Sequence, residues 1–155
     1  MFGAVEVISA VGWGNYWFFD NLVYLTNAKF LQGDKKTYAY WGAFGWTIGL
    51  LGKVILSVRE LLKSANEEAA LRESLKTADG KTAEEIKPKI AALVGKRTQQ
   101  TLNLAANAAD LLVASNGIEI PAKVLGQGLN DGVLGACGLF SALVAGYYAW
   151  FEVNK

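Results

Sequence analysis

Two largely apolar stretches of the chain are long enough to suggest membrane-spanning helices. Twenty uncharged residues lie between Asp131 and Glu152. A helix of that length is about 30 Å long, which matches the hydrocarbon core of a bilayer. A second uncharged run extends from Ala39 to Gly52. The pattern predicts spans over residues 131–151 and about 38–56; for the former, a buried helix of a soluble all-α domain is the alternative.

Small residues recur at helical spacing in both predicted spans. In lipid, such rows let two helix backbones approach closely, which replaces the hydrophobic effect as the source of association. Gly45-x-x-x-Gly49 matches the motif typical of such contacts. We therefore expect the two spans to form a hairpin and to pack on each other. The expected helix-packing residues are Gly42, Gly45, Gly49 and Gly52 in one span and Gly135, Gly138, Ala142 and Gly146 in the other.

Aromatic residues mark both ends of the chain. Residues 15–31 are predicted to form one helix, but Asp20 and Asn21 interrupt its apolar surface, so it is too polar to span a membrane unaided. We expect this helix to lie in the membrane interface, where amphipathic rings are favoured. The candidate interfacial residues are Trp13, Trp17, Tyr24, Tyr147, Tyr148 and Trp150.

The middle of the chain is charged and predicts amphipathic helices. The first continues the earlier span to about residue 76, and the second covers about 83–115, opened by a Thr82-x-x-Glu85 capping box. Residues 118–127 contain Pro121 and are expected to form a linker that returns the chain to the membrane at Asn130. Lys53 lies within an apolar run and is expected to snorkel or to pair with Asp131. The whole chain is predicted to be one all-α, membrane-associated helical domain.

Composition excludes several classes of function. The chain is 52% hydrophobic and 19% charged, and its net charge of +1 gives no reason to expect a nucleic-acid partner. Histidine is absent and Cys137 is the only cysteine. The usual zinc, haem and iron–sulfur ligand sets and the Ser-His-Asp and Cys-His catalytic arrangements therefore cannot form. We predict a protein that is not an enzyme, with no catalytic or metal site and no required cofactor.

Three stretches together resemble one known family. Residues 17–31, which contain Asp20-Asn21, are similar to the aromatic F-x-x-DN-x-x-(W/Y)-L segment of the peroxisomal biogenesis factor 11 (peroxin-11) family. The hydrophobic helix after Trp41 ends in Arg59-Glu60-Leu61, similar to that family's Arg-(Asp/Glu)-Leu exit. A helix bearing Asp110-Leu111, followed by a linker and a glycine-rich final helix, resembles the family's C-terminal pattern. The residues that carry the resemblance are Asp20, Asn21, Arg59 and Asp110.

The resemblance implies a protein of the peroxisomal membrane that oligomerises and promotes membrane elongation before organelle division. For some members it also implies a channel for small metabolites, which Lys53 and Arg59 would line here. Family members normally carry a further N-terminal half with amphipathic helices. This chain starts just ahead of the Asp20-Asn21 segment, so we expect that half to be missing.

The leading hypothesis is therefore a non-catalytic, membrane-organising protein that oligomerises through its glycine faces. The alternative is a small accessory or scaffold subunit of a large membrane complex, photosynthetic or respiratory, in a thylakoid or mitochondrial inner membrane. That subunit would contact pigments or lipids, and without histidine a chlorophyll would need a ligand such as Asn27, Gln99, Asn103, Asn107 or a glutamate. The expected partners are membrane lipid and either further copies of the chain or subunits of such a complex.

Overall fold

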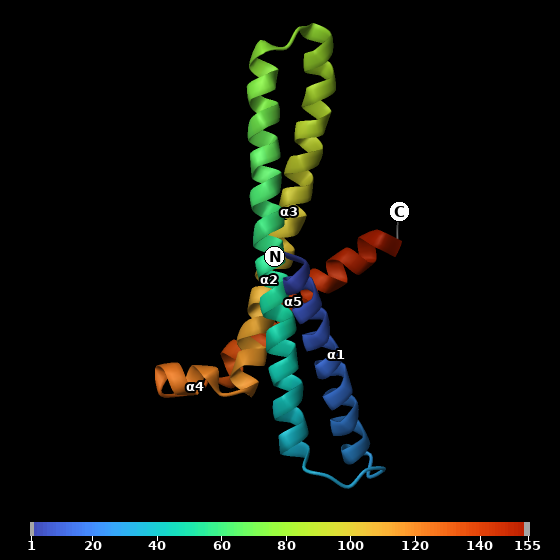
Figure 1. Cartoon of the computed structure of the whole chain (residues 1–155), viewed down its shortest axis with the longest axis vertical. Coiled ribbons are helices and arrows are strands. Elements are labelled where there is room, and N and C mark those ends of the chain that lie inside the picture. The colour runs from blue at the N-terminus through green and yellow to red at the C-terminus, as the bar shows by residue number, and fades with distance from the viewer. Residues whose placement is uncertain (1, 154–155) are drawn as a thin grey trace. The chain divides into compact units, whose positions relative to one another are not determined.

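The described part of the protein is entirely helical. The computed structural model describes residues 2–153, with side chains for residues 3–150, and this part contains five helices and no strand. They are α1 (Phe2–Asn27), α2 (Lys35–Thr77), α3 (Gly80–Gly117), α4 (Ile120–Leu125) and α5 (Asp131–Val153) (Figure 1). The all-α prediction is confirmed. The chain divides into two compact units: the first holds the residues up to Leu56 and from Ala105 onward, and the second holds Ser57–Leu104.

Three of the helices begin at an Asp or Asn side chain that accepts hydrogen bonds from the first turn. The Lys36 amide and the Thr37 hydroxyl donate to the Asp34 carboxylate (3.0 and 2.6 Å). The Val133 amide donates to Asn130 Oδ1 at the start of α5 (2.9 Å). The Thr82 amide donates to Asp79 Oδ1 (3.0 Å), so α3 begins at Gly80 and not at the predicted capping box.

Helix α1 is longer toward the N-terminus than the sequence suggested. It begins at Phe2 rather than Asn15, and it ends at Asn27 rather than Leu31. Beyond its end, Lys29 adopts a left-handed conformation (φ 61°), which turns the chain toward α2. The early start places Gly12 inside a helix, where glycine is destabilising because of its conformational freedom. Its lack of a side chain is an advantage here, because α1 packs closely on α2.

Helix α2 is shared by the two units. Its 43 residues correspond to about 65 Å, roughly twice the thickness of a bilayer's hydrocarbon core. Both α2 and α5 contain a segment that is long and apolar enough to cross a membrane, as predicted for these two stretches. The first half of α2 (residues 35–56) belongs to the first unit together with α1 and α5.

In the first unit, α1 and the first half of α2 lie side by side and run in opposite directions (Figure 1). The last part of α3, from Ala105 to Gly117, also runs beside this half of α2. A Cβ added at Gly117 would lie 2.8 Å from the Ala43 Cβ. The chain therefore already returns alongside the first candidate span in α3, before the linker that was predicted to bring it back to the membrane.

The predicted linker contains a short helix of its own. Helix α4 has Pro121 at its start, where a missing amide hydrogen costs nothing. Glu119 before it and Gly126 after it are both left-handed (φ 62° and 77°). The Leu129 amide donates to Asn116 Oδ1 (2.9 Å), which ties the end of the linker to the end of α3.

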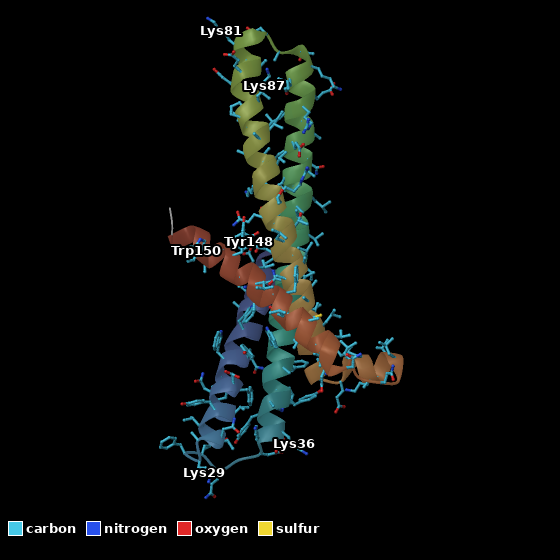
Figure 2. The ribbon with its side chains drawn as sticks, turned by 180° about the vertical axis from the view of Figure 1, so that it is seen from behind. Lys29, Lys36, Lys81, Lys87, Tyr148 and Trp150 are labelled. Carbon is cyan, nitrogen blue, oxygen red and sulfur yellow. The ribbon has the colours of Figure 1, made fainter. Side chains whose placement is uncertain are left out.

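The second unit is a two-helix hairpin made by the later part of α2 and the earlier part of α3. Ile86 and Ile90 are buried in it, and α3 contains Pro88 in its early turns. The Ser64 hydroxyl donates to the Gln100 side-chain oxygen across the hairpin (3.1 Å). Lys81 and Lys87 lie close to the turn between the two helices (Figure 2).

Candidate helix-packing and membrane-facing surfaces

The glycine face of α2 is filled by α1. A Cβ added at Gly12 would lie 2.6 Å from the Gly49 nitrogen and 2.8 Å from the Gly45 carbonyl oxygen, distances that real side chains do not show. An added Cβ at Gly49 would meet the Trp13 ring at 2.9 Å, and one at Gly52 would meet the Ser9 side chain. Glycines on both helices thus bring the two backbones into direct contact. Sequence analysis paired this face with the glycine row of residues 131–151, but in this chain α1 occupies it.

Polar side chains of α1 point into this contact and bond to the backbone of α2. The buried Ser9 hydroxyl donates to the Gly49 carbonyl oxygen (2.8 Å). Asn15 Nδ2 donates to the Trp41 carbonyl oxygen (2.7 Å). A polar group without a partner is costly in an apolar surrounding, so these bonds allow Ser9 and Asn15 to lie within an apolar helix pair.

Lys53 also has a partner on α1. Its ammonium nitrogen lies 4.7 Å from the centroid of the Trp13 ring, within the range of a cation–π interaction. Of the two predicted alternatives, pairing with Asp131 does not occur among the described residues, where the ammonium contacts Trp13. Snorkelling stays a prediction. The arrangement holds the lysine beside the apolar helix pair without an acidic partner.

The glycine row of α5 is open. Nothing lies within 4 Å of a Cβ added at Gly135, Gly138 or Gly146, and Ala142 is exposed. Of the apolar window that makes α5 a candidate span, 6% is buried, against 33% for the window in α2. Leu139 and Leu143 flank the row and are both more than half exposed. Of the two predicted glycine faces, one is therefore used within the chain and the other is not.

Most of the predicted interfacial aromatic residues are exposed. Trp17, Tyr24, Tyr147 and Trp150 each expose more than half of their surface, whereas Trp13 and Tyr148 are half-buried. Tyr148 and Trp150 lie near the C-terminal end of α5 (Figure 2). Tyr147 and Tyr148 meet edge to face, with ring centroids 5.4 Å apart. Whether these rings lie at headgroup level stays a prediction.

Comparison with known proteins identifies the family. The family model described as Peroxisomal biogenesis factor 11 matches residues 1–150. This chain belongs to the peroxisomal biogenesis factor 11 family. It is 26% identical over 150 residues to the peroxisomal membrane protein 11 homolog of Dictyostelium discoideum, covering 87% of this chain and 57% of that protein. It is 24% identical over 149 residues to peroxisomal membrane protein 11A of Arabidopsis thaliana, covering 94% of this chain and 59% of that protein.

The comparisons cover nearly all of this chain but only part of each relative. The chain spans less than two thirds of the length of the two curated relatives that it matches. The match to the family begins at residue 1, ahead of the Asp20-Asn21 segment on which the sequence resemblance rested. No solved structure matches the chain.

The residues that carried the family resemblance lie on three different helices. Asp20 and Asn21 are exposed on α1, and Asn21 Nδ2 donates to the Trp17 carbonyl oxygen one turn earlier (2.7 Å). Arg59 is exposed on α2, and Asp110 is half-buried on α3. Arg59 belongs to the second unit and the other three to the first.

Sequence analysis missed the residues of α1 that make the closest contact. Ser9, Gly12 and Asn15 follow one another at intervals of three, which places a small or hydrogen-bonding residue on nearly the same side of each turn. The helix was predicted to begin at Asn15, so Ser9 and Gly12 lay outside it. The spacing of the three residues was the signal that could have revealed this face.

Proposed function

We propose that this protein is a non-catalytic organiser of the peroxisomal membrane that self-associates through the open face of α5. Membership of the peroxisomal biogenesis factor 11 family and the names of its relatives support the peroxisomal membrane as its location. Several copies bound side by side would impose a common curvature that a single copy cannot. Oligomerisation is therefore the step on which membrane shaping depends.

The observation that carries this proposal is the difference between the two glycine faces. The face of α2 is already occupied by α1, with two hydrogen bonds to its carbonyl groups. On α5, a Cβ added at Gly135, Gly138 or Gly146 would meet nothing within 4 Å. Close backbone approach is the main source of helix association in lipid. A second α5 is a suitable occupant, because two identical rows form a symmetric contact.

The proposal is tested by adding bulk to the row. Gly138→Leu combined with Ala142→Leu would separate the helices but leave the span apolar, so membrane insertion should be unchanged. We expect the oligomer seen by cross-linking in detergent and in liposomes to be lost, together with tubulation of those liposomes. Ala136→Leu is the matched control, since Ala136 is exposed on α5 outside the row. An oligomer that persists in the double variant would rule out this contact.

A further inference from the structure

Two cavities in the first unit share one tryptophan in their walls. A crevice of about 550 Å³ lies between the start of α2 and the end of α3, and its walls include Lys36, Tyr40, Trp41 and Glu119. An apolar groove of about 300 Å³ runs between α1 and α2. Its walls include Ile8 and Val11 of α1 and Trp41, Phe44 and Ile48 of α2. Trp41 lines both, so the crevice with its charged and aromatic walls shares one side chain with the apolar groove.

The crevice offers one positive and one negative group. The Lys36 ammonium and the Glu119 carboxylate are both exposed, and neither forms an ion pair within residues 3–150. The Thr37 hydroxyl in the same crevice already donates to Asp34. The charge of Lys36 also acts on the Asp34 carboxylate, but at a distance longer than an ion pair, so Lys36 is the cation in this crevice that an anion can approach. Figure 2 shows Lys36 at the start of α2.

Two aromatic rings complete the crevice. Tyr40 and Trp41 meet edge to face with their centroids 5.8 Å apart, and 39% and 44% of their surfaces are exposed. Aromatic faces next to a carboxylate form a favourable surrounding for an alkylammonium group. Glu119 is held in a left-handed conformation (φ 62°) that is uncommon for residues other than glycine. Non-glycine residues in sparsely populated backbone regions cluster at ligand-binding sites.

We propose that the two cavities together bind one molecule of a zwitterionic phospholipid. Its phosphate lies against the Lys36 ammonium, and its choline or ethanolamine group lies against Glu119 and the Tyr40–Trp41 pair. One acyl chain fills the groove between α1 and α2. The site is at the start of the candidate span of α2, which is the level of the headgroups in a bilayer. This site does not depend on self-association through α5.

The chemistry of the crevice excludes close alternatives. A lipid whose headgroup carries only negative charge would satisfy Lys36 but would leave Glu119 facing like charge. A diacylglycerol would fill the apolar groove and leave both charged groups without a ligand. A free headgroup would leave the groove between α1 and α2 empty. Only a lipid with both charges and a tail uses both compartments.

The test is competitive photolabelling of the full chain in mild detergent. The probe is phosphatidylcholine with a diazirine in one acyl chain, and the labelled peptides are identified by mass spectrometry. We expect labels on the peptides holding Ile8–Val11 and Trp41–Ile48. Unlabelled phosphatidylcholine should compete about tenfold better than phosphatidylglycerol or diacylglycerol, a difference of the size expected from losing one well-placed charge contact.

Variants then separate a built site from general lipid contact. Lys36→Gln with Glu119→Gln should reduce the competed labelling about tenfold. Lys81→Gln with Glu84→Gln, an exposed pair in the second unit, is the matched control and should change nothing. Labelling that does not saturate, that spreads evenly over α5, or that survives in the Lys36/Glu119 variant overturns the proposal. Stronger competition by phosphatidylglycerol, with loss on Lys36→Gln but not on Glu119→Gln, also overturns it in favour of a simple anion site.

Discussion

The two units hold their helices together by different means. In the first, α1 and α2 touch through backbone at Gly12, Gly45 and Gly49, and the polar side chains between them bond to carbonyl groups. In the second, the helices touch through side chains, and a carboxylate is the central group. The first arrangement gains its energy from close packing and needs no water, as expected of helices in lipid. The second exposes charges on its outer faces, as expected of helices in water.

Glu68 is the centre of the second arrangement. Its side chain is 8% exposed and lies between Arg72 Nε at 2.7 Å and the Arg97 guanidinium. The hydrogen bond from Arg72, with the charges of Arg97 and Arg72, holds the pKa of Glu68 below its ordinary value of 4.5, against the opposing effect of burial. Arg72 lies one turn away on the same helix, whereas Arg97 is on α3. The pair with Arg97 therefore joins the two helices of the hairpin.

The largest effect should come from adding one methyl group to the first unit. In Gly45→Ala, the new Cβ would meet the Gly12 carbonyl oxygen and the Tyr16 nitrogen, each 2.8 Å away, and a backbone cannot easily move aside. We expect a loss of about 1–3 kcal/mol in unfolding free energy, measured by SDS titration in mixed micelles. Gly42→Ala is the control, because its Cβ would meet Phe19 at an ordinary 3.5 Å. Equal effects of the two variants would contradict the backbone contact.

The second unit should respond to loss of a charge rather than to added bulk. Glu68→Ala leaves Arg97 without its partner across the hairpin, so we expect faster amide hydrogen exchange throughout Ser57–Leu104. Exchange in α1 and in the first half of α2 should hardly change. Glu67→Ala is the control, since Glu67 is exposed and its contact with Lys63 lies within one helix. A similar acceleration in both variants would show that Glu68 has no special role.

Acid should loosen the second unit selectively. Because the folded pKa of Glu68 is lowered, its contribution to stability is fully present above the ordinary value of 4.5 and is lost as pH falls through the lower, folded value. The pKa of Asp79 is also lowered, by its hydrogen bonds from Thr82, so the start of α3 should weaken in the same direction. Hydrogen exchange compared between about pH 7 and about pH 3 measures this loss, after correction for intrinsic rates. Glu68→Gln should remove most of the pH dependence across the hairpin; an unchanged dependence would assign it to other groups.

The smallest effects should come from the hydrogen bonds between α1 and α2. Ser9→Ala and Asn15→Ala each remove one bond to a carbonyl group that also belongs to a helix. Bonds of this kind in membrane proteins contribute about 0.6 kcal/mol on average, so each variant should lose about that much in the same SDS titration. A loss as large as that of Gly45→Ala would mean that hydrogen bonding, and not close packing, dominates the first unit.

The two candidate spans could be predicted from the sequence, because each depends on a continuous run of apolar and small residues. The uncharged stretches in α2 and α5 and the glycine spacing on both follow from length and period alone. The partner of the α2 face did not follow, because Gly12 has meaning only once Gly45 and Gly49 lie opposite it. Asp79 was missed as the N-cap of α3 for a different reason. Thr82-x-x-Glu85, three residues later, is an equally good sequence signal for the start of a helix. The crevice at Lys36 and Glu119 joins residues far apart in the chain, so only the tertiary structure could reveal it.

The open glycine row of α5 makes the proposed self-association depend on how much of the protein the membrane holds. In the interior of α5, backbone groups bond to one another within the helix, so a lone copy exposes no interior backbone group to lipid without a partner. Under the proposed function, pairing then follows mass action in two dimensions and rises with the number of copies per area of membrane. The same proposal predicts that a peroxisome begins to change shape once enough chains have accumulated in its membrane.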